Sequence, residues 1–239
     1  MKILVFGKNG QVGRELSKYE NVISLTKKDA DFFNLKNCLN LISEIKPTTV
    51  INAVALTDVE LCEKNKKDAE IVNAIAPIEI GKICKKLFIP FIHISSDYVF
   101  DGKKGKPYFE NDFPNPINYY GLSKLSAEKG ILSLNSNNII LRTSWVYSNS
   151  KNNFLSKIIS KANKYKELNV VYDQFGSPTS AKDIANTCIL ISELIKSKKN
   201  KNNIYHYSSY PITSFFDYAE FILKTINHSA KINRIKTEE

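Results

Sequence analysis

The chain has 239 residues, which fits one α/β domain or one such domain with a small lobe attached. Its formal net charge is +10, but the lysines are spread over almost every expected helix and form no single basic patch with interleaved aromatics. No apolar run approaches the roughly 20 residues of a membrane-spanning helix, and residues 2–6 are too short for the apolar core of a signal peptide. Nucleic acid and membrane are therefore not expected as partners.

Short β-branched runs alternate with longer helical patterns over the first 150 residues. The expected strands are Ile3–Phe6, Val22–Leu25, Val50–Ala53, Phe91–Ile94 and Ile139–Leu141. The expected helices are Val12–Lys18, Ala69–Leu87 and Tyr119–Leu134. This alternation, with strands that are apolar on both faces, predicts an α/β fold with a doubly wound parallel (Rossmann) sheet. Right-handed crossovers would place the carboxyl ends of the strands along one edge, where ligands bind.

The pattern loosens from about Phe154 onward. Here we expect helices at Phe154–Lys164, Lys182–Ile195 and Ser214–Ile226, strands at Leu168–Val171, Ile204–Tyr207 and from Ile232, and a polar loop at residues 196–203. We divide the chain into a dinucleotide-binding Rossmann domain, residues 1–150, and a small C-terminal substrate lobe, residues 151–239. This lobe is expected to be interleaved with the last strands of the sheet.

The cysteines and histidines show no metal-binding or disulfide pattern. Four cysteines are scattered through apolar or helical contexts, with no pair at CxxC spacing (Cys38, Cys62, Cys84 and Cys188). Buried free thiols are expected, which suits a reducing compartment and predicts a cytoplasmic protein. His93, His206 and His228 have no ligand spacing, so no metal site is expected, and His93 is interpreted as a hydrogen-bonded core residue within a strand.

A glycine-rich turn follows the first expected strand. Gly7, Gly10 and Gly13 have GxxGxxG spacing between strand and helix. Gly7 would permit the tight turn, Gly10 the close approach of a phosphate, and Gly13 close packing of helix on strand. The backbone N–H groups of Gln11 and Val12 would bind a pyrophosphate at the start of the helix. The turn predicts a dinucleotide cofactor.

The end of the second strand bears on the choice of cofactor. A carboxylate at this position, about 20 residues after the glycines, would hold the ribose of NAD. The chain has Thr26-Lys27-Lys28 instead, and two lysines can pair with a 2′-phosphate, so NADPH is favoured over NADH. Asp31 and Phe32 follow closely, and two interpretations stay open for them: an edge for the adenine, or a polar loop with one buried aromatic.

Three further segments carry reactive or small side chains to the expected ligand edge. Tyr120 and Lys124 lie four residues apart, one turn along the same helix face. A phenol is a poor acid at neutral pH, but an ammonium one turn away favours the phenolate and so tunes the group to protonate a developing alkoxide. The strand at residues 91–94 delivers Ser96 and Asp97, and a hydroxyl at this point can hydrogen-bond a substrate carbonyl. The small residues of 52–57 would let a cofactor lie flat over the strand ends.

These residues, in this order, resemble the extended short-chain dehydrogenase/reductases, and most closely the dTDP-4-dehydrorhamnose reductase family. The matching segments span residues 1 to about 185: GKNGQVGREL, INAVALTDVELCE, ISSDYVFDGKKGKPYFE, NPINYYGLSK, LRTSWVY and DQFGSPT. The resemblance implies NAD(P)H-dependent reduction of the C4 ketone of a nucleotide-activated 6-deoxy sugar, most closely dTDP-4-dehydrorhamnose to dTDP-rhamnose, in the synthesis of cell-surface polysaccharide.

The resemblance also implies roles for individual residues. Ser96, Tyr120 and Lys124 would form the catalytic triad, with Ser96 at a position where the family usually has Thr. The cofactor would contact Gly10, Gln11 and Val12 at its pyrophosphate, Asp31 and Phe32 at its adenosine end, and Ala55, Leu56 and Thr57 at its middle, besides Tyr120 and Lys124. The sugar would face Val59, Ser96, Asp97, Tyr120 and Trp145. Many members are dimers, which leaves a homodimer open.

Members of the family usually continue well past the position that matches Ile235, so we expect the sugar side of the site to be open or differently built here. Three alternatives stay beside the main interpretation. The substrate is a related nucleotide-4-keto sugar; or the chain is a non-catalytic dinucleotide-binding regulatory subunit; or it is an epimerase or dehydratase with tightly bound NAD.

Overall fold

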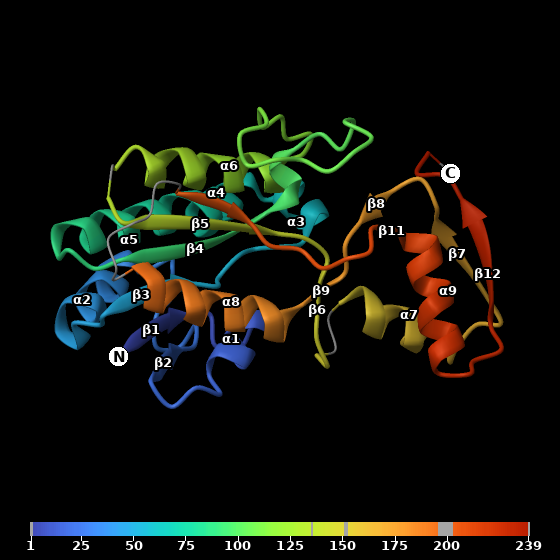
Figure 1. Cartoon of the computed structure of the whole chain (residues 1–239), viewed down its shortest axis with the longest axis horizontal. Coiled ribbons are helices and arrows are strands. Elements are labelled where there is room, and N and C mark those ends of the chain that lie inside the picture. Colours follow the sequence, from blue (N-terminus) through green and yellow to red (C-terminus); the bar gives the residue numbers. More distant parts are fainter. Residues whose placement is uncertain (1, 135, 151–152, 196–202, 239) are drawn as a thin grey trace. The chain divides into compact units, whose positions relative to one another are not determined.

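The computed structural model describes residues 2–134, 136–150, 153–195 and 203–238, and the expected polar loop at 196–203 lies almost wholly outside them. The contacts within the chain group into two compact units. The first comprises residues 1–143 and 184–207, and the second comprises residues 144–183 and 208–239. The chain thus leaves the first unit after β5 and returns to it before its last sheet strand (Figure 1).

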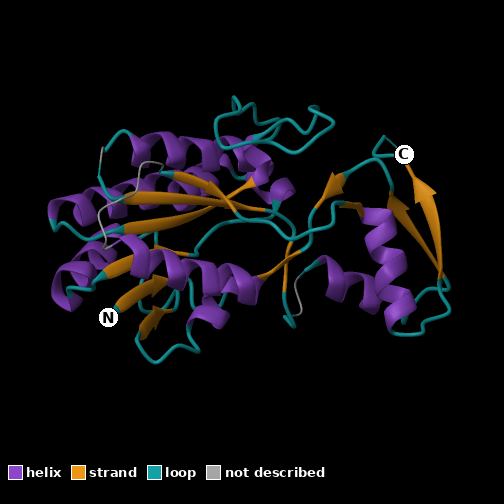
Figure 2. Ribbon diagram, viewed as in Figure 1, coloured by secondary structure: helices purple, strands orange, loops and turns teal. Residues whose placement is uncertain are grey.

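Within the described residues, a parallel sheet of six strands forms the centre of the first unit (Figure 2). Its strands are β1 (Ile3–Phe6), β2 (Val22–Leu25), β3 (Thr49–Asn52), β4 (Phe91–Ser96), β5 (Asn138–Thr143) and β10 (Ile204–His206). They lie in the order β10-β5-β4-β3-β1-β2, every neighbouring pair parallel. The predicted doubly wound α/β fold is confirmed, and its direction of winding changes between β1 and β3, where such sheets bind ligands.

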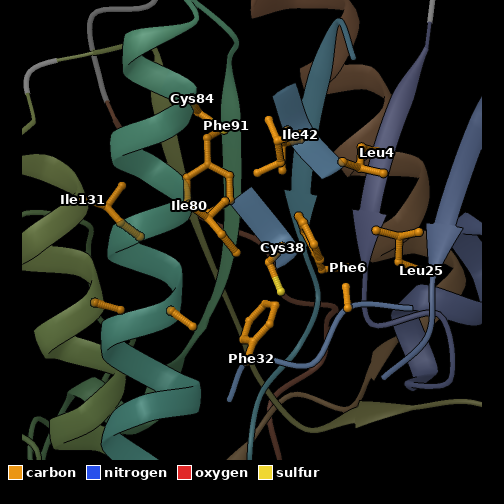
Figure 3. Packing of buried hydrophobic residues seen from close by; sticks show 14 of the residues in the cluster. Leu4, Phe6, Leu25, Phe32, Cys38, Ile42, Ile80, Cys84, Phe91 and Ile131 are labelled. Atoms are coloured by element: carbon orange, nitrogen blue, oxygen red, sulfur yellow. The ribbon is translucent and has the colours of Figure 1, made fainter. Parts of the chain in front are cut away.

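Helices cover both faces of this sheet. Their bounds are α1 (Gln11–Leu16), α2 (Leu35–Ile45), α3 (Val59–Lys64), α4 (Lys66–Glu70), the π-helical turn η1 (Ile71–Ile75), α5 (Ala76–Lys86), the 3₁₀ turn η2 (Asp97–Val99), α6 (Tyr119–Leu132) and α8 (Ala181–Leu194). Helices α2, α5 and α6 pack on one face, where Ile42, Ile80 and Ile131 meet the strand residues Phe6 and Phe91 (Figure 3). Helices α1 and α8 lie on the other face (Figure 1). Because both faces are covered, β1, β3 and β5 are buried along their whole length.

Several helical features differ from the sequence analysis, which predicted neither the short helix α3 nor the turn η2. Helix α2 was not predicted, although Leu35, Cys38 and Ile42 repeat at helical spacing and the last two are buried. The single helix predicted at Ala69–Leu87 runs from α4 to α5, but its middle is the π-helical turn η1. A π-helical turn takes up one extra residue and often marks a functional site. Within the described residues, no helix is long and apolar enough to cross a membrane.

The second unit is built on its own small core. Its elements are β6 (Val146–Tyr147), α7 (Phe154–Ala162), β7 (Glu167–Val171), β8 (Phe175–Gly176), β9 (Thr179–Ser180), β11 (Thr213–Ser214), α9 (Phe215–Thr225) and β12 (Lys231–Ile235). Strands β7 and β12 pair in parallel, and α7 and α9 pack with them around Ile158, Leu168 and Phe216. Short pairs join β8 to β11 and β6 to β9. The four short strands of these last two pairs were not predicted.

The four cysteines are free and buried, as predicted. Burial raises the pKa of Cys38 to about 11 and that of Cys188 to about 12, and it also raises the pKa of Cys62 and Cys84. A thiol with a raised pKa carries little thiolate at neutral pH, and the thiolate is the reactive form. These cysteines therefore act as small apolar residues of the core.

The glycine turn makes a very close backbone contact at the sheet edge, and it supplies a test. A Cβ atom on Gly13 would lie 2.0 Å from the carbonyl oxygen of Gly7, so helix α1 lies this close to the turn only without a side chain there. We expect Gly13→Ala to lower the free energy of unfolding by about 3 kcal/mol or more, measured by urea denaturation. Gly102→Ala is the control, because nothing lies within 4 Å of its Cβ and only its φ of +74° carries a cost, about 1 kcal/mol. Equal losses would contradict the steric explanation.

Candidate active site

The glycine turn has the conformation that a phosphate-binding turn needs. Gly7 has a φ of +101°, and a Cβ on it would lie 2.9 Å from the carbonyl group of Ala53 at the end of β3. Gly10 caps helix α1 and donates its N–H to the Gly7 oxygen at 3.0 Å. Gln11 and Val12 form the first turn of α1, and α1 has no acidic residue in that turn. The turn and the start of α1 can therefore accept an anion.

A cavity of about 400 Å³ adjoins this turn. Its lining combines the glycine turn, the end of β2, and the loops that follow β2 and β3; it includes Gly7, Gly10, Thr26, Lys27, Ala30, Asp31, Phe32, Phe33, Val54, Ala55, Leu56 and Asn65. All of these residues belong to the first unit. A larger hollow of about 700 Å³ in the second unit contains none of the predicted site residues. The smaller cavity thus brings together half of the predicted cofactor contacts: Gly7, Gly10, Asp31, Phe32, Ala55 and Leu56.

The two aromatics after β2 play different parts. Phe32 is buried and packs edge to face on Phe6, with ring centroids 5.6 Å apart, so it belongs mainly to the core (Figure 3). Phe33, which the sequence analysis passed over, is 48% exposed, and the Lys27 ammonium lies 5.4 Å from its ring centroid. Lys27 also lies 3.8 Å from the Asp31 carboxylate. Phe33, and not Phe32, therefore presents an accessible ring face at the cavity. Sequence spacing alone does not distinguish these two neighbouring aromatics.

The loop that follows β3 is fixed by a residue that the sequence analysis missed. Asn73, in the π-helical turn η1, accepts a hydrogen bond from Leu56 N–H at 2.8 Å and donates one to the Leu56 oxygen at 3.0 Å. Its amide also donates to Ser123 Oγ at 3.1 Å, on α6. Ala55 and Leu56 therefore line the cavity in a fixed conformation, while Thr57 is exposed. The available signal was a polar side chain within an apolar helical stretch.

The catalytic candidates meet at the end of β4. Ser96 is the last residue of this strand, its hydroxyl donates to Asp97 Oδ1 at 2.9 Å, and its side chain interacts with that of Tyr120. Tyr120 is 8% exposed, and the ring of Tyr98 packs edge to face on it at 5.4 Å between centroids. Val59 packs in the same small cluster as Tyr120. The structure thus brings Ser96, Asp97 and Tyr120 together.

Lys124 lies one turn further along α6 and is almost wholly buried, at 1% exposed. Its ammonium nitrogen Nζ lies 2.7 Å from the Ile94 carbonyl oxygen and 3.0 Å from Nε2 of His93, both on β4. Burial lowers the pKa of Lys124 to about 7, although Glu128 opposes this shift. A Cβ on residue 121 would lie 2.0 Å from the Tyr98 carbonyl oxygen. Because Gly121 has no side chain, α6 can lie this close to the end of β4.

Burial also sets the acidity of the other groups. It raises the pKa of Tyr120 well above the usual range, and the interaction with Ser96 only partly opposes this shift. It raises the pKa of Asp97 to about 6. In the chain alone, therefore, Lys124 does not lower the pKa of Tyr120 as expected: both groups are desolvated, which disfavours phenolate and ammonium alike. Tyr120 holds its proton.

Trp145 belongs to the second unit. Its backbone has a φ of +42°, and its ring stacks on Phe215 with centroids 3.7 Å apart. A Cβ on Gly176 would lie 2.3 Å from the same ring, so the ring occupies the space that this glycine leaves. Trp145 is thus held rigidly by its own unit. Among the residues that the structure describes, no group of His, Cys, Asp or Glu is arranged to hold a metal ion.

The parallel sheet, the glycine turn and the Ser96-Tyr120-Lys124 set define the extended short-chain dehydrogenase/reductase class. The family model of the RmlD substrate binding domain matches residues 1–239. The dTDP-4-dehydrorhamnose reductase of Escherichia coli (strain K12) is 34% identical over 94% of this chain and 78% of its own length. The chain belongs to the RmlD substrate binding domain family, which confirms the resemblance in its sequence motifs.

Two solved structures of dTDP-4-dehydrorhamnose reductases are similar over almost the whole chain. The reductase of Clostridium acetobutylicum ATCC 824 has a TM-score of 0.93 at 34% identity and covers 100% of this chain and 85% of its own. The reductase of Bacillus anthracis str. Ames, solved in complex with NADP, has a TM-score of 0.90 at 31% identity, covering 99% and 85%. These similarities confirm the fold at the level of the whole chain.

The buried amine gives a prediction with a defined pH dependence. Between pH 7 and pH 10.5 the unfolded chain holds a proton on Lys124 that the folded chain does not, so this residue makes stability rise with pH. We expect Lys124→Met to raise the free energy of unfolding at pH 7 by about 1–3 kcal/mol. This gain should shrink by up to about 1.4 kcal/mol for each pH unit above 7.

Urea denaturation at pH 7 and pH 9 measures this difference. Lys129→Met is the matched control, because Lys129 is exposed on the same helix and its replacement should give no pH-dependent gain. A gain at Lys124 that stays constant with pH would contradict a lowered pKa.

Proposed function

We propose that this protein reduces the C4 ketone of a dTDP-4-keto-6-deoxy sugar, dTDP-4-dehydrorhamnose, with a nicotinamide dinucleotide as hydride donor. The observation that carries the proposal is the meeting of Ser96, Tyr120 and Lys124 at the end of β4 and the start of α6. The names of the relatives, including one solved with NADP, support both the substrate and the cofactor.

The residues around the cavity fit such a cofactor. The first turn of α1, with Gly10, Gln11 and Val12, would hold the pyrophosphate, and the small and apolar residues Ala55 and Leu56 would face its middle. The close backbone contact at Gly7 supports this assignment, because a Cβ there would fill the space beside Ala53. Asp31, Phe32 and Phe33 would surround the adenosine end of the cofactor. Thr57, which comes directly after Ala55 and Leu56, would contact the middle of the cofactor with them.

The chain's own groups would handle the proton and orient the ketone. The bound cofactor supplies a hydride to C4. Tyr120 holds its proton at neutral pH, because burial raises its pKa, and would donate this proton to the ketone oxygen. Ser96, whose side chain interacts with that of Tyr120, would donate to the same oxygen and fix its position. Lys124 would contact the nicotinamide ribose, and its positive charge would stabilise the phenolate left on Tyr120.

The contacts to the sugar are assigned to Val59 and Asp97 in the first unit and Trp145 in the second. Asp97 supports this assignment because it is hydrogen-bonded to Ser96 and so stands beside the position of the ketone. Trp145 supports it because its ring is held by Phe215 and Gly176 and offers a rigid aromatic surface.

Two further aspects belong to this proposal. A cytoplasmic location is inferred from the free, buried thiols and from the intracellular origin of nicotinamide and nucleotide-sugar substrates. A homodimer and the absence of a nucleic-acid partner stay predictions, for which the size of the protein in solution and a filter-binding assay are the measurements.

The acid is tested by Tyr120→Phe. This change removes the proton donor and keeps the buried ring, so we expect a loss of at least about 100-fold in kcat while the Kd for NADPH stays within about twofold. Oxidation of NADPH in the presence of dTDP-4-dehydrorhamnose measures kcat. The neighbouring Tyr119→Phe is the matched control and should keep wild-type activity. Retained activity in Tyr120→Phe would remove this residue as the acid, and an inactive wild type that binds NADPH would favour a regulatory subunit.

The cofactor preference is tested at the end of β2. Removal of two cations near the adenosine end, in Lys27→Ala with Lys28→Ala, should weaken NADPH about 10-fold and NADH about twofold or less, since only NADPH carries the 2′-phosphate. Fluorescence titration gives both values of Kd. Lys82→Ala is the control, because Lys82 is a surface lysine paired with Glu79 on α5, outside the cavity. Equal losses for both cofactors would contradict the role of the lysines.

A further inference from the structure

A chain of hydrogen bonds joins three side chains of the sheet core to the candidate active site. The backbone N–H of Val54 donates to Asn52 Oδ1 at 2.9 Å, which fixes the orientation of the Asn52 amide. The amide nitrogen Nδ2 of Asn52 therefore faces Nδ1 of His93, at 3.0 Å. On its other side the ring presents Nε2 to the Lys124 nitrogen, also at 3.0 Å. His93 is thus bonded at both ring nitrogens and fully buried.

The direction of these bonds follows from the donors. An amide nitrogen can only donate, so Nδ1 of His93 must accept and carries no proton. Burial, together with the nearby Lys124, lowers the pKa of His93 well below its usual range, so the ring is neutral and holds a single proton. That proton must be on Nε2. The orientation of Asn52 therefore determines the tautomer of His93.

The tautomer of His93 in turn determines the protonation state of the Lys124 amine. An ammonium group has three N–H donors and no acceptor, so it cannot receive the Nε2–H of His93. A neutral amine can receive this bond with its lone pair and still donate to the Ile94 oxygen at 2.7 Å. The lowering of the Lys124 pKa to about 7 agrees with this arrangement.

We propose that His93 is a positioning residue for Lys124: the His93 ring holds the ε-amine as a neutral hydrogen-bond acceptor in the free protein. Binding of an anionic dinucleotide is then coupled to protonation of this lysine. The coupling rests on the proposed function, whereas the direction of the hydrogen bonds does not. The lysine would then carry its charge only when the cofactor is present, which is when a positive charge beside Tyr120 is needed.

The other charged and titratable groups of this region leave that assignment in place. Glu128, one turn beyond Lys124, raises the lysine pKa, but its two oxygens bond Arg142 at 3.0 and 2.7 Å, on β5. Tyr120 is neutral because burial raises its pKa, and the pKa of Asp97 is raised to about 6. Among the side chains that the structure describes, His93 is thus the one that hydrogen-bonds the amine.

The tautomer is tested on the wild-type protein by a long-range ¹H–¹⁵N spectrum with ¹⁵N-labelled imidazoles. The chain has three histidines, so His206→Gln and His228→Gln assign the signals by elimination. The expected result is a neutral His93 with its proton on Nε2 from pH 6 to pH 9. A proton on Nδ1, or a charged ring in this range, would overturn the proposal without any bearing on catalysis.

The coupling is tested by calorimetry of NADPH binding at pH 8 in buffers that differ in ionisation enthalpy. The wild type should take up most of one proton per site, and His93→Gln should take up at most a third of that amount, because a glutamine oxygen can accept from an ammonium that is already charged. His206→Gln is the matched control on the same sheet and should behave as the wild type. Equal uptake in His93→Gln, or none in the wild type, would overturn the coupling. A protein that binds no NADPH would contradict the proposed function, and the spectrum alone would then decide the role of His93.

Discussion

The burial of one lysine amine constrains the whole ligand edge of the sheet. Lys124 extends from α6 into the core, where its amine needs partners that only β4 supplies, the Ile94 carbonyl and the His93 ring. An unpaired amine at 1% exposure would cost several kcal/mol, so α6 must lie at a fixed height on β4. Any side chain at residue 121 would collide with the Tyr98 carbonyl oxygen. The glycine at this position therefore allows α6 to pack at this distance from the end of β4. The position of Tyr120, which directly precedes Gly121 on this helix, then follows from the packing of the helix.

The cofactor side of the edge depends on the same helix through a second amide. The Asn73 side chain hydrogen-bonds both backbone groups of Leu56 and the hydroxyl of Ser123. This hydroxyl in turn donates to the backbone carbonyl oxygen of Tyr120 at 2.7 Å. The loop after β3 and the catalytic helix are therefore joined by one side chain. The π-helical turn is what brings Asn73 to this point, since it shifts the register of the helix by one residue. A local irregularity in one helix thus sets the spacing between two parts of the site.

The sequence predicted those features that depend on local pattern. The apolar runs at Ile3–Phe6 and Phe91–Ile94 have no other stable environment than a sheet covered on both faces, and the structure places them in one. The glycine turn and the spacing of Tyr120 and Lys124 were likewise visible, because backbone freedom and helix geometry are local properties. The unpredicted helix α2 also had a local signal, the helical spacing of Leu35, Cys38 and Ile42. This helix could therefore have been predicted from the sequence.

Features that depend on partners distant in the chain were out of reach. The pKa of Tyr120 was expected to fall because a lysine lies one turn away, but spacing gives a separation and says nothing of the surrounding dielectric. The structure buries both groups, and desolvation then outweighs their interaction. Similarly, a histidine inside a strand pattern suggests only a core residue, whereas its contacts with Asn52 and Lys124 require two other segments to be placed first. Charge at such a site is therefore a property of the folded assembly of strands, and it changes when a ligand alters the burial or the charge around the same groups.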